Sequence, residues 1–196
     1  MSLCGRVNVV EGLLSYSVRH GAQRGVGLSL SDHSYDGSLD NDTAILTGGL
    51  GQLTDGVEGP SNFRLGAAQL GRRGYEWVGW KNESASVQLM FEFEAVRNFS
   101  VVSIHTNNMF NRDVRLFRRA VMQFAVQPFQ FDETPEVAFD VTRDSENESA
   151  RNVIIPISNR VARFVKMQLF FDAKWMLISE VSFQSGTHPG TLSWWT

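Results

Sequence analysis

Residues 87–94 form the stretch VQLMFEFE, and this stretch decides which fold we expect. Its apolar side chains, Val87, Leu89, Phe91 and Phe93, occupy every second position, and three of the four positions between them are glutamine or glutamate. Successive side chains of a strand point to opposite faces, so this pattern gives one apolar face and one polar face. The stretch therefore predicts a half-buried antiparallel β-strand.

Similar alternation recurs along the chain, and turn-forming residues separate the runs. No run has the period of an amphipathic helix, and one short turn near residues 54–57 is the most helix that we expect. Many short strands with glycine-rich connections predict an all-β fold, a β-sandwich whose two sheets cover one core. The other expected strands are residues 99–105, 120–127, 153–157, 161–171 and 176–183, with shorter ones at 13–18, 27–30 and 75–80, and the expected turns lie at 35–37, 107–108, 127–128 and 158–159.

The composition suits one folded domain. The chain has 196 residues, of which 42% are hydrophobic and 20% charged, so it can bury a core. We expect one β-sandwich domain over residues 11–186, a junction at residues 1–10 and a tail at residues 187–196. The net charge of −3 disfavours nucleic-acid binding. No apolar run approaches the roughly 18–20 residues that cross a bilayer, and no signal peptide is evident.

Four sequons indicate an extracellular chain. Asn41, Asn82, Asn98 and Asn147 each match Asn-x-Ser/Thr, whereas the eleven asparagines would give about one or two matches by chance. Ordinary polar turns are the alternative explanation. Because no leader is evident, we expect the chain to be a segment of a longer protein. Cys4 is the single cysteine, and it suggests a disulfide partner outside this chain, although a buried free thiol is equally compatible.

Two segments far apart in the sequence have the chemistry of a metal site. The first, residues 48–59, is a glycine-punctuated loop with Gln52 and Asp55, and the second, residues 175–183, is an expected strand with one carboxylate, Glu180. Ca²⁺ takes six to eight oxygens from carboxylates, amides and carbonyls, and glycines let loop carbonyls turn inward. We therefore expect a structural Ca²⁺ site. The alternative is that Asp55-Gly56 is an ordinary turn and Glu180 a solvated strand residue.

The sequence does not predict an enzyme. The four histidines show no metal-ligand spacing and no serine–aspartate framework around them. No phosphate-binding loop or nucleotide fingerprint is present. The only basic cluster is Arg112, Arg115, Arg118 and Arg119, which is most simply a solvated strand face; a glycan sulfate or an acidic patch of a partner is the alternative.

Six motifs in order connect these observations to a known family. The chain resembles the extracellular discoidin-like domain of the discoidin domain receptors, which are collagen-activated receptor tyrosine kinases. The resemblance covers about residues 12–185 and implies a discoidin, or galactose-binding-like, jelly-roll β-sandwich with a structural Ca²⁺. The motifs are YDG at 35–37, GLGQLTDGV at 49–57, GYEWVGW at 74–80, MFEF at 90–93, NNM at 107–109 and SEVSF at 179–183.

The resemblance also implies a ligand set for the metal. Gln52 and Asp55 would bind through side chains, and three further residues through their carbonyls. Ser31 stands where relatives have asparagine. Its hydroxyl is shorter and a weaker ligand than an amide oxygen, so water can take its place at the metal. The complete implied set is Ser31, Gln52, Asp55, Val57, Tyr75, Trp77, Ser179 and Glu180.

Two expectations about cysteines follow from the same resemblance. Relatives have a disulfide at positions that correspond to Thr106 and Gln168 here, so that bridge is absent. Cys4 matches a cysteine that closes a bridge within the preceding discoidin domain, which implies that residues 1–10 are a remnant of that domain or a junction to it.

The resemblance implies a non-catalytic, calcium-stabilised extracellular module of a collagen-responsive receptor. It would pack against the collagen-binding discoidin domain of the same receptor, support signalling or receptor dimers, and belong to a protein anchored in the plasma membrane, with its kinase domain outside this chain. It would contact neither nucleic acid nor the membrane itself. The alternative is a free-standing carbohydrate- or lipid-binding module of the discoidin type.

Overall fold

The stretch at residues 87–94 lies in the central strand of the structure, β5 (Ser86–Thr106). The computed structural model describes residues 10–65, 74–131 and 135–187. Val87, Leu89, Phe91 and Phe93 are buried, while Gln88 is exposed and Glu92 half-buried, as alternation requires. The prediction of a half-buried antiparallel strand is confirmed, because β5 pairs antiparallel with all three of its neighbours.

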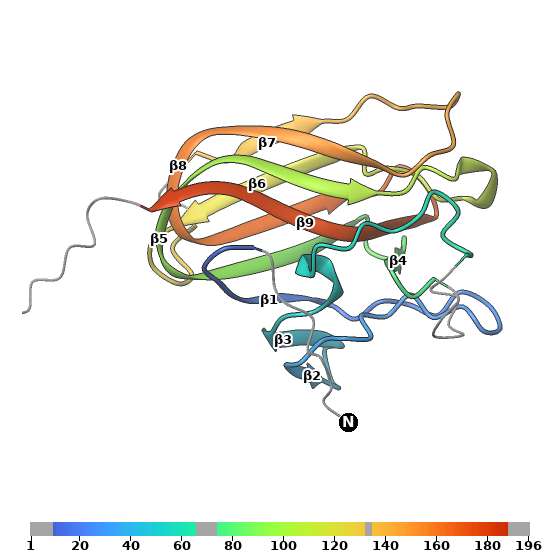
Figure 1. Cartoon of the computed structure of the whole chain (residues 1–196), viewed down its shortest axis with the longest axis horizontal. Coiled ribbons are helices and arrows are strands. Elements are labelled where there is room, and N and C mark those ends of the chain that lie inside the picture. The colour runs from blue at the N-terminus through green and yellow to red at the C-terminus, as the bar shows by residue number, and fades with distance from the viewer. Residues whose placement is uncertain (1–9, 66–73, 132–134, 188–196) are drawn as a thin grey trace, which may run out of the picture.

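The described residues form an all-β sandwich (Figure 1). The main path of paired strands runs β2-β3-β1-β5-β8-β6-β7, and β9 pairs with β5 and β4 off this path. Helix is limited to two 3₁₀ turns, η1 (Gln52–Thr54) and η3 (Phe110–Arg112), and no described helix is long and apolar enough to cross a membrane. The other strands are β1 (Leu13–Arg19), β2 (Ser38–Asp40), β3 (Ile45–Gly49), β4 (Val78–Lys81), β6 (Arg119–Ala125), β7 (Val137–Asp140), β8 (Arg151–Phe170) and β9 (Trp175–Thr187).

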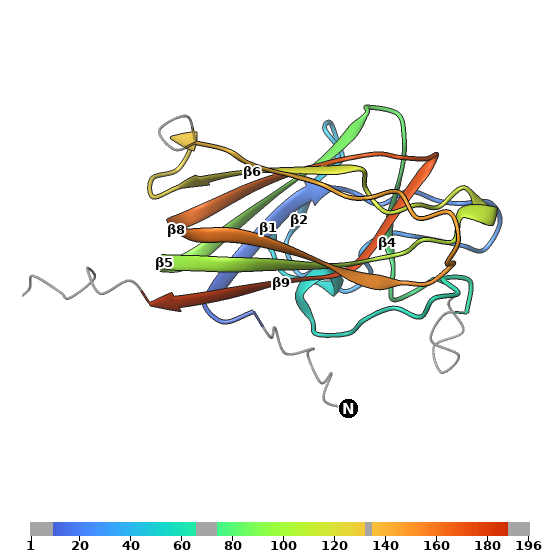
Figure 2. The same ribbon diagram turned by 90° about the horizontal axis from the view of Figure 1, so that it is seen from above.

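Strands β5 and β8 take part in both layers of the sandwich (Figure 2). β5 pairs with β1 over residues 89–93 and with β9 over residues 97–106. The β5–β8 ladder shifts register between Glu92 and Arg97 and again between Phe99 and Val101. Ser158 and Asn159, on the facing part of β8, have positive φ angles of 53° and 56°. Extra residues of this kind bend a strand, so the paired strands turn from one layer into the other.

The bend changes how the predicted strands are divided. The expected strands 99–105 and 153–157 are continuous with 87–94 and 161–171, because the expected turn at residues 158–159 is a bend inside β8. The expected strand at 27–30 is wrong, since Leu28 and Ser29 form isolated bridges there instead of a strand, that of Ser29 with Gln23. Short strands β2, β3 and β7 were not expected. All three lie toward the ends of the strand order, and β2 is fully exposed, so none of them shows clear apolar alternation.

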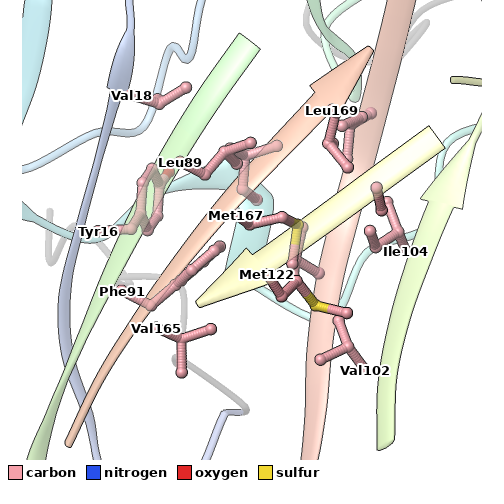
Figure 3. Packing of buried hydrophobic residues seen from close by; sticks show 14 of the residues in the cluster. Tyr16, Val18, Leu89, Phe91, Val102, Ile104, Met122, Val165, Met167 and Leu169 are labelled. Atoms are coloured by element: carbon pink, nitrogen blue, oxygen red, sulfur yellow. The ribbon is translucent and has the colours of Figure 1, made fainter. Parts of the chain in front are cut away.

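The core lies between the layers and is rich in aromatic and sulfur-containing side chains (Figure 3). Tyr16 and Phe91 lie beside Leu89 at one end of the close-up, and Met122 and Met167 fill its centre. The ring of Phe93 meets Phe99 edge-on at 4.8 Å and Phe183 at 5.4 Å. Edge-to-face contacts of this kind add to the stability gained from burial.

The structure does not place Thr106 and Gln168 where a disulfide would join them. Thr106 is buried and donates to the Leu177 carbonyl at 2.9 Å, whereas Gln168 donates to Ser86 Oγ at 2.9 Å on the outer face of β8. Because side chains alternate, it is the neighbouring Met167 that faces the core. Gln168 is therefore the wrong position for the counterpart of such a bridge. Residues 1–9, with Cys4, and the tail after Thr187 lie outside the described residues.

The substitution Phe93→Ala tests the aromatic core. Phe93 is fully buried, so we expect the free energy of unfolding to fall by about 3–5 kcal/mol. Urea denaturation of the isolated chain measures this change. Phe129→Ala is the matched control, because Phe129 is 91% exposed and we expect it to change stability by less than about 0.5 kcal/mol. Equal effects of the two substitutions would contradict the assigned core.

Candidate metal centre

The first expected metal segment is a loop that leaves β3 and returns across β9. It contains η1, whose Gln52, Leu53 and Thr54 are all buried, and η1 contacts β9 directly. Gly51 comes so close to its surroundings that an added Cβ would lie 2.6 Å from the Asp32 carboxylate oxygens. A side chain at this position would therefore push the loop away from the sandwich.

Glu180 joins this loop to β9. Its Oε2 accepts a hydrogen bond from the Gly56 amide at 2.9 Å, across 124 positions of the sequence. The residue is only 6% exposed. Its second oxygen, Oε1, is buried and has no hydrogen-bond partner among the residues that the structure describes. An acceptor oxygen left in this way is costly unless a proton or a cation occupies it.

Burial raises the pKa of Glu180 from its ordinary value of 4.5 to about 8. Within this net shift, the Gly56 hydrogen bond lowers the pKa, and the negative charges of Asp55 and Glu58 contribute to raising it. Asp55 is thus close enough to repel the charge of Glu180, while its own Oδ1 accepts from the Val57 amide at 3.0 Å. The structure therefore brings together the two carboxylates that the sequence analysis paired.

Gln52 connects its loop to two other segments at the same place. Its Nε2 donates to the Tyr75 carbonyl, and its Oε1 accepts from the His33 amide at 2.5 Å. The His33 and Tyr75 rings stack at 5.4 Å, nearly parallel. Gln52 is 1% exposed, so the side chain is held in place by protein contacts. Its Oε1 already accepts a hydrogen bond, which any metal would have to share or displace.

Ser179 precedes Glu180 at a register shift in the β5–β9 ladder, where His105 pairs with Glu180 and Thr106 with Ile178. Ser179 Oγ accepts from the Gly59 amide at 2.9 Å and lies 2.6 Å from His105 Nδ1. The Trp77 ring stacks on His105 at 5.4 Å and is fully buried. Both side chains are thus held by protein contacts around His105.

The Ser179–His105 contact continues to Glu58, whose Oε2 is 3.7 Å from His105 Nε2. Serine, histidine and a carboxylate in this order have the composition of a catalytic triad. Ser179 is fully buried, however, and its hydroxyl already accepts a backbone hydrogen bond, so a substrate has no access to it. Burial also lowers the pKa of His105. The arrangement is a structural contact between β5, β9 and the loop.

Ser31 is 9% exposed, and its hydroxyl lies 2.9 Å from Ser29 Oγ. Val57 is 40% exposed at the edge of the loop.

Asp32 is a buried residue of this region that the sequence analysis missed. Its carboxylate accepts from the Tyr16 hydroxyl, and from the Gln52 amide at 3.1 Å and the Ser34 amide at 3.3 Å. Asp32 thereby fixes the start of η1. Aspartate before His-Ser in a polar loop gives no sign of burial, so only the contact with Tyr16 on β1 identifies its role.

The donor set fits a hard cation better than a transition metal. Among the described residues no group of three or more histidine, cysteine, aspartate or glutamate side chains could hold a metal. A site here must therefore combine the carboxylates of Asp55 and Glu180 with amide and carbonyl oxygens, which is the ligand chemistry of Ca²⁺. The buried Oε1 of Glu180 is the observation that fits such an ion.

Three of the four sequon asparagines are exposed: Asn41, Asn82 and Asn147. Asn98 differs, because it is half-buried within β5 and pairs in the ladders to both β8 and β9. An attached glycan is therefore easier to accommodate at the first three positions.

A groove of about 1180 Å³ lies on the outer face of β1 and β5, away from the loop with Gln52. Ser15, Ser17 and Met90 line its floor, and Phe129 lines its edge. Its charges are paired, since Arg163 meets Glu92 at 2.9 Å. The groove therefore offers hydroxyl and apolar contacts rather than an acid–base pair.

Comparison with known proteins gives a family match along nearly the whole domain. Residues 12–185 match the family described as the DS-like domain of discoidin domain-containing receptor 1/2. The chain is 37% identical over 192 residues to the discoidin domain-containing receptor tyrosine kinase B of Caenorhabditis elegans, covering 94% of this chain and 23% of the relative. It is 34% identical over 216 residues to the epithelial discoidin domain-containing receptor 1 of Homo sapiens, covering 100% of this chain and 23% of that protein. The chain thus spans less than a quarter of these relatives.

Solved structures with a similar arrangement of strands are much more distant in sequence. The C-terminal domain of a chitobiase from Bacteroides fragilis is 8% identical, with a TM-score of 0.48 over 89% of this chain and 92% of that chain. The lectin domain of lectinolysin, in complex with Lewis B antigen, is 15% identical, with a TM-score of 0.46 over 69% of this chain and 83% of that chain.

The raised pKa of Glu180 gives a pH dependence with a definite sign. Without a cation, the folded state holds this proton more tightly than the unfolded state, so the stabilisation is complete below about pH 4.5 and is lost as the pH rises toward 8. We therefore expect Glu180→Gln to be more stable than wild type at pH 8 in chelator, but not at pH 5. Denaturation at both pH values measures this difference. Asp140→Asn, at an exposed carboxylate, is the control, and the same pH dependence in wild type and Glu180→Gln would contradict the assignment.

Proposed function

The chain belongs to the DS-like domain family of the discoidin domain receptors, and from this premise we propose that it is a calcium-stabilised extracellular module of a collagen-responsive receptor. The matched family is an extracellular module and implies no catalytic role for this chain. In this proposal the receptor's tyrosine kinase lies elsewhere in a longer protein anchored in the plasma membrane. The relatives named above are receptors more than four times as long as the matched segment, which supports this arrangement.

Calcium would serve structure rather than chemistry. The single observation that supports it most is the buried Glu180 oxygen without a partner, beside the second carboxylate of Asp55. A Ca²⁺ ion bound by both would neutralise their repulsion and attach the loop after β3 to β9. Gln52 and the carbonyls of Val57, Tyr75 and Trp77 are the further oxygens that lie around this loop, with Ser179 beside Glu180 and Ser31 as the weakest candidate.

Collagen would be bound through the adjacent discoidin domain of the same receptor. In this proposal the present domain packs against that neighbour as a rigid spacer and supports signalling, with a receptor dimer as the expected assembly. The bent β5–β8 pair joins both layers, which supports the role of a rigid spacer. Glycans at the exposed asparagines Asn41, Asn82 and Asn147 fit an extracellular location.

A free-standing carbohydrate-binding module is the second candidate function. The groove on β1 and β5 favours it, because serine hydroxyls and an exposed aromatic ring are suitable contacts for a sugar. The lipid-binding form has less support, since Leu50 and Met109 pack against the core clusters instead of projecting into solvent. Binding on a glycan array that is lost in Ser15→Arg would favour this second function.

Calcium should raise the melting temperature of the chain. Because only the folded state offers the site, an ion at about 100 times its dissociation constant adds about 2.7 kcal/mol, or roughly 5–10 °C for a domain of this size. Differential scanning calorimetry with Ca²⁺ and with chelator measures the shift. We expect Asp55→Asn and Glu180→Gln to reduce it strongly and Asp140→Asn to leave it intact. An unchanged transition in wild type would refute the calcium site.

The isolated chain should not bind collagen tightly. We expect no submicromolar binding to immobilised triple-helical peptides in surface plasmon resonance, because the proposed collagen site belongs to the neighbouring domain. A protein that contains both domains is the positive control. Submicromolar binding by this chain alone would refute the division of roles while leaving the calcium prediction untouched.

A further inference from the structure

Three arginines meet at one end of the sandwich, although they are far apart in the sequence. Arg24 lies in the loop after β1, Arg64 in the loop before β4 and Arg112 in η3. Both views place the loop after β1 and the η3 turn at the same end of the molecule (Figures 1 and 2). The three positive charges are near enough that Arg112 and Arg64 both lower the pKa of Arg24, after the larger effect of burial.

The guanidinium of Arg24 is held in a fixed position. It lies 5.0 Å from the centre of the Phe63 ring and 5.0 Å from that of Trp175, and its Nη2 donates to the Arg112 carbonyl. Its Nη1 is buried and has no hydrogen-bond partner among the described residues. A guanidinium group that two aromatic rings hold in place, with its Nη1 donor unpaired, is suited to bind an oxyanion.

Arg64 and Arg112 are exposed, and within the described ranges neither forms an ion pair. The other arginines of the cluster expected from sequence are engaged elsewhere. Arg115 donates to the Asp144 carbonyl, Arg118 to the Phe171 carbonyl, and Arg119 pairs with Asp140 at 3.3 Å. The run of four arginines is therefore not one site, and only Arg112 joins the group with Arg24 and Arg64.

Two acidic groups lie beside this cluster, Asp113 and Glu148, and the Glu148 carboxylate accepts from the backbone and side-chain amides of Asn111 in η3 at 2.5 and 2.6 Å. Asp113 acts on Arg24 more strongly than either neighbouring arginine does, and it follows Arg112 in a left-handed conformation at the end of η3. Three arginines against the carboxylates of Asp113 and Glu148 leave a net charge of +1 in this cluster. Like charges held together without enough counter-charge attract a polyanion.

We propose that Arg24, Arg64 and Arg112 form a binding site for the sulfate groups of a sulfated polysaccharide. Guanidinium groups bind such oxyanions through bidentate hydrogen bonds. A linear chain presents several sulfates in sequence, so one ligand can reach all three arginines. Arg24 is recessed between Phe63 and Trp175, which suits a narrow sugar chain better than a flat membrane surface. The site is independent of the calcium and collagen proposals.

Binding of a heparin oligosaccharide to the full chain tests the site. By isothermal titration calorimetry at low salt, we expect Arg64→Ala combined with Arg112→Ala to weaken binding by on the order of tenfold or more, since charged hydrogen bonds are lost. We expect Asp113→Asn to strengthen binding. Arg119→Ala is the matched control and should change nothing, because its guanidinium pairs with Asp140. Affinity should also fall as salt is added.

Arg24 needs a milder test, because removing its side chain disturbs Phe63 and Trp175. Arg24→Lys keeps the charge but loses the planar fork, so we expect weaker binding at an unchanged melting temperature. Three results would overturn the proposal: an equal loss in Arg119→Ala, equal binding of desulfated heparin, or no heparin binding at all. Binding only to phosphatidylserine vesicles, lost on substitution of the exposed Val26 and Leu65 by serine, would assign this end to a membrane instead.

Discussion

The pairing of β5 with β8 constrains almost everything else in the domain. These two strands belong to both layers, and each bends where the register between them shifts. Because β1 and β9 both pair with β5, the bend sets how far apart the layers lie and which side chains meet between them. The aromatic contacts of Phe93 with Phe99 and Phe183 follow from this geometry, since residues before and after the bend face the same core.

The candidate metal centre is a consequence of the same arrangement. β9 pairs with the second half of β5, and the loop after β3 lies across β9 because η1 buries Gln52 and Leu53 against the sandwich. Glu180 is thereby removed from water next to Asp55, where a proton or a cation must compensate its charge. Asp32 and Tyr16 hold the start of η1 from the other side. The loop is therefore positioned by the packing of η1 against the sandwich and by the buried hydrogen bonds of Asp32. A cation would add one more stabilising contact.

The surface shows how identical residues acquire different roles. Arg115, Arg118 and Arg119 follow one another closely, but their guanidinium groups serve carbonyls and a carboxylate of their own neighbourhood. Arg24 and Arg112 are 88 positions apart, yet one donates to the carbonyl of the other. Whether an arginine is available to a ligand thus depends on which partners the fold supplies. In the same way, burial distinguishes the sequon asparagine Asn98, which is half-buried, from Asn41, which is exposed.

The sequence by itself determined the fold class, and it identified the loop with Asp55 and the strand with Glu180 as two segments that form one candidate site. Alternation in residues 87–94 identified a half-buried strand because a strand's side chains alternate with period two, and the motifs around Asp55 and Glu180 identified the loop and the strand that meet. It could not divide the strands correctly at residues 158–159, nor detect β2, β3 and β7, because bends and short edge strands depend on partners far away in the chain. Only the tertiary structure decided that Glu180 is buried with an oxygen unsatisfied, that Asp32 supports η1, and that Arg112 joins Arg24. Burial, pKa and charge pairing are properties of a residue's neighbours in space, which a one-dimensional pattern does not contain.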